Sequence, residues 1–181
     1  MSNRGDFSNE ENVKQADRAL LSFKEVADKL GVEWCLFAGT ALGFFRNKGY
    51  INWDNDIDIA LTGGEADLDK VSTELYQIGF NIGRDCTNND GTRNRHLWGG
   101  METAHDTESG ILVDVFYTFT DTEKQFLHSF EAIDYKGRLF LIPRPIKRYL
   151  IETYGKGFMV PQKGIKAKYE PERKISYVNT R

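Results

Sequence analysis

The sequence predicts an α/β protein in which helices cover the faces of a β-sheet. An apolar stripe at helical spacing over residues 13–30 is typical of an amphipathic helix. Two apolar segments with β-branched residues, 56–61 and 111–117, are typical of buried strands. Because 181 residues are enough for one such core, we expect one domain over residues 1–161, followed by a basic tail over 162–181.

Local signals place the other elements of the first half of the chain. Ser8 and Glu11 form a capping-box pattern before the first helix, and Gly31 ends that helix. The apolar run 32–38 predicts a buried strand. After it we expect a turn at 39–40, a short helix over 41–48, an amphipathic helix around 68–78 and a short strand over 80–84. Glycines and polar clusters mark the boundaries between these elements.

Turn signals also divide the second half of the chain. The Asp-Gly pair at 90–91 favours a hairpin. The elements that we expect after it are a strand over 93–98, a polar loop over 101–109, a hairpin tip at 121–123 with a second arm over 125–135, a strand over 138–142 and a helix from Pro145 to Tyr154.

The composition is that of a soluble globular protein, with 40% hydrophobic and 28% charged residues. No apolar run approaches the length of a membrane span, and the N-terminus lacks the apolar region of a signal peptide. We therefore expect a cytoplasmic protein. Cys35 belongs to a predicted buried strand and Cys86 to a polar loop, which indicates neither a disulfide framework nor a zinc site.

Charge is distributed unevenly along the chain. Residues 136–181 hold twelve Lys and Arg and three Glu, a net charge of +9, so residues 1–135 carry −12. A basic end favours a polyanionic partner, such as the phosphates of a nucleotide, an anionic glycan, a membrane face or nucleic acid. A solubilising tail folded against the acidic remainder explains the same pattern equally well.

Carboxylates alternate at the start of the predicted strand 56–61. Side chains alternate across a strand, so Asp56 and Asp58 share a face, roughly 7 Å apart, while Ile57 and Ile59 point into the core. Crowded carboxylates raise a pKa, and an oxygen-rich site of this kind suits Mg²⁺ or Mn²⁺. Taken alone, the pair is at least as typical of a solvated loop with an Asp that caps a helix.

Asp114 lies in the middle of the apolar strand 111–117. Burial of its charge without a partner would be costly, so the carboxylate needs a cation. An arginine side chain and a metal ion both meet that need.

The turn at Gly39 and Thr40 joins a predicted strand to a predicted helix. A helix N-terminus after such a turn presents free backbone N–H groups to an anion. A phosphate held there, beside a metal on the next strand, is an arrangement for phosphoryl transfer.

Together these motifs resemble the LicD family, which includes the fukutin-related proteins, within the nucleotidyltransferase superfamily. The family pattern is close to Gly-Thr-Leu-Leu-Gly, Arg-x-Lys-Gly and Ile-Pro-Trp-Asp-Asp-Asp-Ile-Asp. This chain has Gly-Thr-Ala-Leu-Gly at 39–43, Arg-Asn-Lys-Gly at 46–49 and Ile-Asn-Trp-Asp-Asn-Asp-Ile-Asp at 51–58. Asn52 replaces the proline and Asn55 the middle aspartate, but the Asp-x-Asp pair is intact.

The resemblance covers residues 20–62 closely and 110–161 more loosely. It implies the nucleotidyltransferase fold, a small mixed β-sheet flanked by helices. It also implies a metal-dependent transfer of a phospho-alcohol, such as phosphocholine, ribitol phosphate or glycerol phosphate. The donor would be CDP-linked, as in CDP-choline, the acceptor a glycan hydroxyl, and the product CMP.

The resemblance further implies roles for seven residues. Asp56 and Asp58 would bind Mg²⁺ or Mn²⁺ on the diphosphate, and Asp114 would complete the triad by holding a second metal or activating the acceptor hydroxyl. Arg46 would neutralise phosphate charge or pair with Asp54, which would orient the acidic turn or the helix that carries the arginine. The residues assigned to donor binding are Gly39, Thr40, Arg46 and Asp54.

Two other functions would use the same residues. A nucleotidyltransferase that moves an NMP from an NTP to a protein, nucleic acid or small molecule needs the same three carboxylates, so the metal motif does not separate it from a LicD-like enzyme. The Trp-Asp at 53–54 and the Arg-x-Lys-Gly at 46–49 favour LicD. A third alternative is a module that binds nucleotide or glycan without catalysis, and the intact carboxylate set argues against it.

Overall fold

The computed structural model describes residues 6–82, 101–106, 108 and 110–164. Its main feature is a five-stranded sheet in the order β1-β2-β5-β4-β3. β2 and β5 run parallel, and the other neighbouring strands run antiparallel. The strands are β1 (Trp34–Leu36), β2 (Asp56–Leu61), β3 (Phe80–Ile82), β4 (Met101–Asp106) and β5 (Leu112–Phe116).

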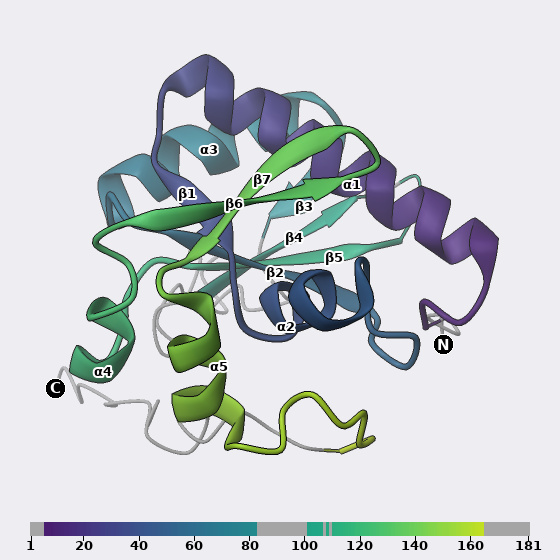
Figure 1. The fold of residues 1–181 in the computed structure, drawn as a ribbon. Coiled ribbons are helices and arrows are strands. Elements are labelled where there is room, and N and C mark those ends of the chain that lie inside the picture. Colours follow the sequence, from purple (N-terminus) through teal and green to yellow (C-terminus); the bar gives the residue numbers. More distant parts are fainter. Residues whose placement is uncertain (1–5, 83–100, 107, 109, 165–181) are drawn as a thin grey trace, which may run out of the picture.

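Helices flank this sheet, and a separate hairpin packs beside it (Figure 1). α1 (Glu10–Leu30) and α3 (Glu65–Gln77) contact each other above the sheet in that view, whereas α2 (Ala38–Asn47), α4 (Asp121–Lys124) and α5 (Ile146–Tyr154) lie below it. The hairpin is formed by β6 (Phe130–Tyr135) and β7 (Arg138–Pro143). The mixed α/β class and the small flanked sheet predicted from the sequence are confirmed.

The apolar stripe of the first helix is buried as predicted, but its N-terminal cap is not the predicted capping box. Asn9 is the cap, and its side chain accepts a hydrogen bond of 2.8 Å from the backbone of Asn12. Gly31 ends the helix at φ 64°, where its N–H reaches the carbonyls of Ala27 and Asp28. The buried residues of the stripe are Ala16, Ala19, Leu20, Phe23, Val26 and Ala27.

Aromatic contacts join the hairpin to the rest of the core. β7 packs against β1, where the rings of Trp34 and Phe140 lie 6.4 Å apart. β6 packs against α2, where Phe44 and Tyr135 lie 4.6 Å apart. Cys35 is fully buried in β1, as expected of a core residue. Within the described ranges, no helix is both long and apolar enough to cross a membrane.

Two elements predicted in the second half of the chain are wrong. The expected polar loop over 101–109 contains β4, which pairs with β3 on one side and β5 on the other. The expected hairpin tip at 121–123 is the short helix α4, in which Thr120 and Glu123 form a capping box. Its expected second arm over 125–135 contains β6, which pairs with β7. β4 is stabilised by pairing with β3 and β5, and the polarity of its own residues does not reveal this pairing.

Other predictions lie partly or wholly outside the described residues. The turn at 90–91, the strand over 93–98 and Cys86 fall in the undescribed range 83–100. Residues 165–181 of the predicted basic tail are also undescribed, so the division into a domain and a tail stays a prediction. The later helix is confirmed, because α5 ends at Gly155 as expected.

Candidate active site

Three predicted carboxylates come together on one face of the central sheet. Asp58 of β2 lies directly opposite Asp114 of β5, and Asp56 comes two residues earlier on β2. Residues in register on neighbouring strands share a face, as do alternate residues of one strand. Ile57 and Ile59 are fully buried on the opposite face. The alternation predicted from the sequence therefore places these side chains as expected.

Asp54 adds a fourth carboxylate, just before β2 begins. Its backbone is fixed on both sides, because its N–H donates to the Ile51 carbonyl and its carbonyl accepts from the N–H of Phe7, both at 2.9 Å. A Cβ built on Gly39 would lie 2.9 Å from Asp54 Oδ2 and 3.1 Å from Asp58 Oδ2. Both carboxylates therefore lie against the same glycine, where no larger residue fits without moving them.

The N-cap and the first turn of α2 hold Asp58 through four hydrogen bonds. Phe37 N–H donates to the Asp58 carbonyl at 2.9 Å, and Asp58 N–H donates to Thr40 Oγ1 at 2.8 Å. The carboxylate oxygen Oδ2 accepts from the backbone N–H of Gly39 at 2.9 Å and of Thr40 at 3.3 Å. The first turn of α2 thus fixes both the backbone and the side chain of Asp58.

This geometry corrects the predicted turn at Gly39 and Thr40. Both residues belong to α2, which begins at Ala38 rather than at 41, and Phe37 is its N-cap without a side-chain hydrogen bond. Their free N–H groups do face an anion, as a helix N-terminus favours. That anion is the carboxylate of Asp58. A phosphate-binding role for Gly39 and Thr40 therefore stays a prediction.

Burial and like charge together disfavour ionisation in this cluster. Burial raises the pKa of Asp58 well above its usual range, and the charges of Asp56, Asp54 and Asp114 raise it further, against a smaller opposing effect of the Thr40 N–H. Burial also raises the pKa of Asp54, with a further contribution from Asp114. Positive charge brought to this face would relieve the repulsion.

The chemistry of these side chains fits a hard divalent cation, which prefers carboxylate oxygen ligands. The candidate ligands are Asp56, Asp58 and Asp114, with Asp54 beside them. Among the described residues, however, no three His, Cys, Asp or Glu side chains are already arranged to hold one metal ion. The carboxylates are thus neighbours without an assembled coordination sphere, and metal binding by the triad stays a prediction.

A pocket of about 170 Å³ opens beside Gly39 and Asp54. Arg46 reaches it from α2 and does not pair with Asp54; its Nε donates to Asn47 Oδ1 at 2.8 Å and its Nη1 to the Phe158 carbonyl at 3.1 Å. Burial lowers the pKa of Arg46. Among the described residues, its buried Nη2 has no hydrogen-bond partner.

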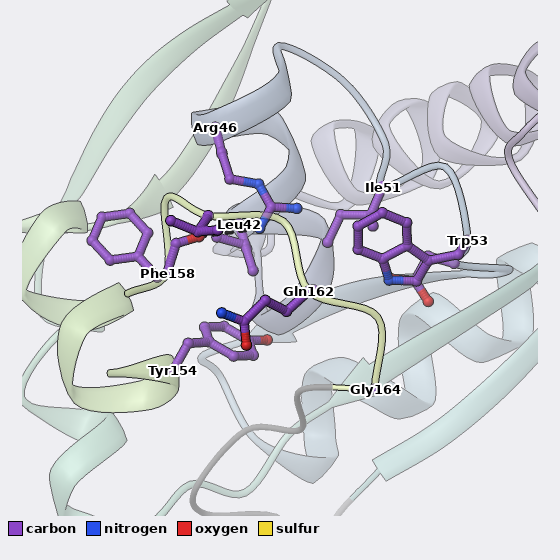
Figure 2. A pocket seen from close by; sticks show the side chains of 11 residues that line it. Leu42, Arg46, Ile51, Trp53, Tyr154, Phe158, Gln162 and Gly164 are labelled. Carbon is purple, nitrogen blue, oxygen red and sulfur yellow. Dashed lines mark hydrogen bonds between the residues drawn. The ribbon is translucent and has the colours of Figure 1, made fainter. Parts of the chain in front are cut away.

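Residues from the C-terminal segment form the other wall of this pocket. Figure 2 shows the guanidinium of Arg46 directed toward the space between Ile51, Trp53 and Gln162. The sequence prediction assigned Arg46 and Asp54 but none of the C-terminal wall. The looser resemblance over 110–161 gave the only signal for this wall. Its lining residues are Tyr154, Phe158, Val160, Gln162 and Gly164.

Comparison with known proteins agrees with these motifs. A family model described as LicD/FKTN/FKRP, nucleotidyltransferase domain, matches residues 31–141, which span β1 to most of β7. The matched residues include all four carboxylates and Arg46. Comparison with curated proteins gives no significant match.

Proposed function

Because the chain belongs to the LicD/FKTN/FKRP nucleotidyltransferase-domain family, we propose that it transfers a phospho-alcohol from a CDP-linked donor to a glycan hydroxyl and releases CMP. The observation that carries this proposal is the placement of Asp56, Asp58 and Asp114 on one sheet face, beside the N-terminus of α2. The choice of CDP and of a phospho-alcohol rests on the family.

The carboxylates are the residues of this chain that would hold a metal. Asp56 and Asp58 are the expected ligands of Mg²⁺ or Mn²⁺, and Asp114 completes the set. A bound divalent cation would neutralise the charge of the donor diphosphate. Asp54, packed against Gly39 next to Asp58, keeps the acidic turn in place.

The transfer exchanges one phosphorus–oxygen bond for another. The acceptor hydroxyl oxygen forms a bond to the phosphorus that carries the alcohol, and the bond from that phosphorus to the bridging oxygen breaks. CMP leaves with the electron pair, and the hydroxyl loses its proton. Asp114 is the carboxylate that we assign to accept this proton, because it lies opposite Asp58 on the neighbouring strand.

The pocket beside Asp54 is the expected donor site. Arg46 contributes positive charge, and its Nη2 lacks a partner among the described residues, as a group that awaits an anionic oxygen would. Trp53 and Tyr154 provide ring faces for the uncharged part of the donor. Because Nη2 is buried, we expect the segment 158–164 to shift when the donor binds.

Thermal unfolding with candidate donors tests this function without knowledge of the acceptor. We would compare CDP, CDP-choline, CDP-ribitol, CDP-glycerol, CTP and ATP, each with and without Mn²⁺, for the wild type, Asp58→Asn and Asp121→Asn. Asp121 is a control for the same substitution, because its exposed carboxylate lies on α4 and pairs with Lys124. A ligand at a hundred times its Kd adds about 2.7 kcal/mol to the free energy of unfolding.

The ligand preference decides between the candidate functions. Metal-dependent stabilisation by CDP compounds over ATP, lost in Asp58→Asn and kept in Asp121→Asn, supports phospho-alcohol transfer. A preference for CTP or ATP over the CDP compounds would instead indicate transfer of an NMP. Stabilisation that needs no metal and survives Asp58→Asn would indicate a binding module without catalysis.

A further inference from the structure

We propose that Tyr149, on α5 and outside the family match, is a positioning residue for the acidic site. Its hydroxyl oxygen accepts a hydrogen bond of 3.1 Å from the backbone N–H of Ala38, the first residue of α2. Ala38 directly precedes the two residues whose N–H groups hold the Asp58 carboxylate. The effect on catalysis rests on the function proposed above, whereas the effect on the α2 N-terminus does not.

The N-terminus of α2 depends on distant side chains for its caps. An N-cap side chain normally accepts from the second or third N–H of a helix, but Phe37 cannot do so. Asp58 of β2 takes that role for Gly39 and Thr40. The remaining N–H of the first turn, that of Ala38, is directed to Tyr149. Two tertiary partners therefore replace a local cap.

The backbone of Ala38 shows why this hydrogen bond matters. Ala38 has a φ of 37°, in a region where residues with a Cβ are disfavoured. Such a conformation persists only where the surroundings hold it. The direction of the Ala38 N–H depends on this φ, and that N–H donates its hydrogen bond to the Tyr149 hydroxyl. Without the hydroxyl, we expect Ala38 to relax and the next two N–H groups to turn away from Asp58.

The packing of Tyr149 keeps its hydroxyl in one position. The side chain is 1% exposed, and its ring lies 5.5 Å from that of Phe37 and 5.6 Å from that of Phe126. A rigid ring delivers its hydroxyl to a defined place, because only two side-chain torsions need to be fixed. The hydrogen bond connects residues 111 positions apart, so α5 is coupled to the start of α2.

Hydrogen exchange of the Gly39 and Thr40 amides tests the positioning role directly. We would measure it in the wild type, Tyr149→Phe and Thr153→Val. Thr153 is a matched control, because it is buried on the same helix and its hydroxyl donates only within α5, to the Tyr149 carbonyl at 2.8 Å. The Leu68 amide, which donates to the carbonyl of Gly64 at the start of α3, serves as a reference on another helix.

We expect Tyr149→Phe to speed exchange at Gly39 and Thr40 at least about tenfold relative to Leu68. Without the hydroxyl, Ala38 is no longer held, so the hydrogen bonds of the two following amides open more often. Thr153→Val should change this ratio less than about twofold. The proposal is overturned if the ratio stays at the wild-type value in Tyr149→Phe, or if both variants shift it equally.

A rescue experiment separates positioning from general packing. Glycine adopts a positive φ without the cost that alanine bears. The double variant Tyr149→Phe/Ala38→Gly should therefore recover most of the protection that Tyr149→Phe loses. Faster exchange in the double variant than in Tyr149→Phe would contradict a role in holding this φ.

Mn²⁺ titration then links the position to the proposed function. We expect Tyr149→Phe to weaken Mn²⁺ binding about tenfold and Thr153→Val to leave it near the wild-type value, as for other groups that orient metal ligands. If wild-type protein binds no Mn²⁺, the proposed function fails while the exchange result still decides the role of Tyr149. If Mn²⁺ binds the wild type and Tyr149→Phe equally, the link between this residue and the site is wrong.

Discussion

Asp114 lies directly opposite Asp58 across the parallel strands β2 and β5. The two strands come from segments more than fifty positions apart in the sequence, so the sheet itself brings the carboxylates together. Asp114 is only 4% exposed, and its charge contributes to the raised pKa of Asp58 after burial and the charges of Asp56 and Asp54. This placement opposes stability and favours a cation, which is typical of a functional site.

Replacement of Asp114 by Asn should change the titration of Asp58. Because one like charge is removed, we expect the pKa of Asp58 to fall, as measured by carboxyl carbon chemical shifts. Loss of a ligand should also weaken Mn²⁺ binding at least about tenfold. Asp121→Asn, at an exposed carboxylate, should alter neither value. Wild-type Mn²⁺ affinity in Asp114→Asn would remove this residue from the metal triad.

Asp58→Asn should stabilise the fold at neutral pH while abolishing turnover. The folded pKa of Asp58 is raised, so from about pH 3.9 upward the folded state binds more protons than the unfolded state, and stability falls as pH rises. The variant lacks this loss because the Asn side chain does not ionise, and its side-chain oxygen can still accept from Gly39 and Thr40.

Urea unfolding from pH 4.5 to 8 measures this effect. The difference in free energy of unfolding between Asp58→Asn and the wild type should grow with pH and then level off above the folded pKa. Each kcal/mol raises Tm by about 2–4 °C in a domain of this size. A difference that shrinks as pH rises, or residual turnover within about tenfold of wild type, would contradict the assigned role.

Gly39→Ala should impair the site more than the fold. The added Cβ would lie 2.9 Å from Asp54 Oδ2 and 3.1 Å from Asp58 Oδ2, which are ends of side chains that can move. We expect at least about a tenfold loss of Mn²⁺ affinity with a change in Tm of only a few degrees. Gly157→Ala, where the Cβ meets nothing within 4 Å, is the matched control.

Gly43 provides the opposite case on the same helix. A Cβ there would lie 2.6 Å from the carbonyl oxygen of Gly49, a backbone atom that cannot move aside easily. Gly43→Ala should therefore lower Tm more than Gly39→Ala does. If the two variants lose equal stability, the Cβ at Gly39 disturbs more than the two carboxylates.

The sequence predicted the parts of this site that depend on local pattern. Alternation in 56–61 placed Asp56 and Asp58 on one face, and the apolar surroundings of Asp114 marked a buried strand. The hairpin tip predicted at 121–123 overlooked the capping pattern of Thr120 and Glu123, which is also present in the sequence. For the strand carboxylates, a pattern within one element was therefore sufficient to place the side chains.

Contacts between distant segments could not be predicted in this way. β4 has no apolar alternation of its own, and residues 83–100 separate it in the sequence from its partner β3. The hydrogen bond from Ala38 to Tyr149 and that from Arg46 to Phe158 each join residues more than a hundred positions apart. No local spacing reveals such pairs, because they depend on how α5 packs.

Arg46→Met should separate the two roles that remain for this side chain. The variant loses the hydrogen bonds from Nη1 to the Phe158 carbonyl and from Nε to the exposed Asn47 side chain, but it also removes a buried Nη2 that has no partner among the described residues. These effects oppose each other, so we expect the free energy of unfolding to change by no more than about 1 kcal/mol.

The KM of Arg46→Met for a CDP-linked donor should rise at least about tenfold, the loss typical of a charge-assisted hydrogen bond. Arg138→Met, at an exposed position of the hairpin, should leave KM unchanged. A lower Tm together with a wild-type KM would show that Arg46 only fastens the C-terminal segment to α2.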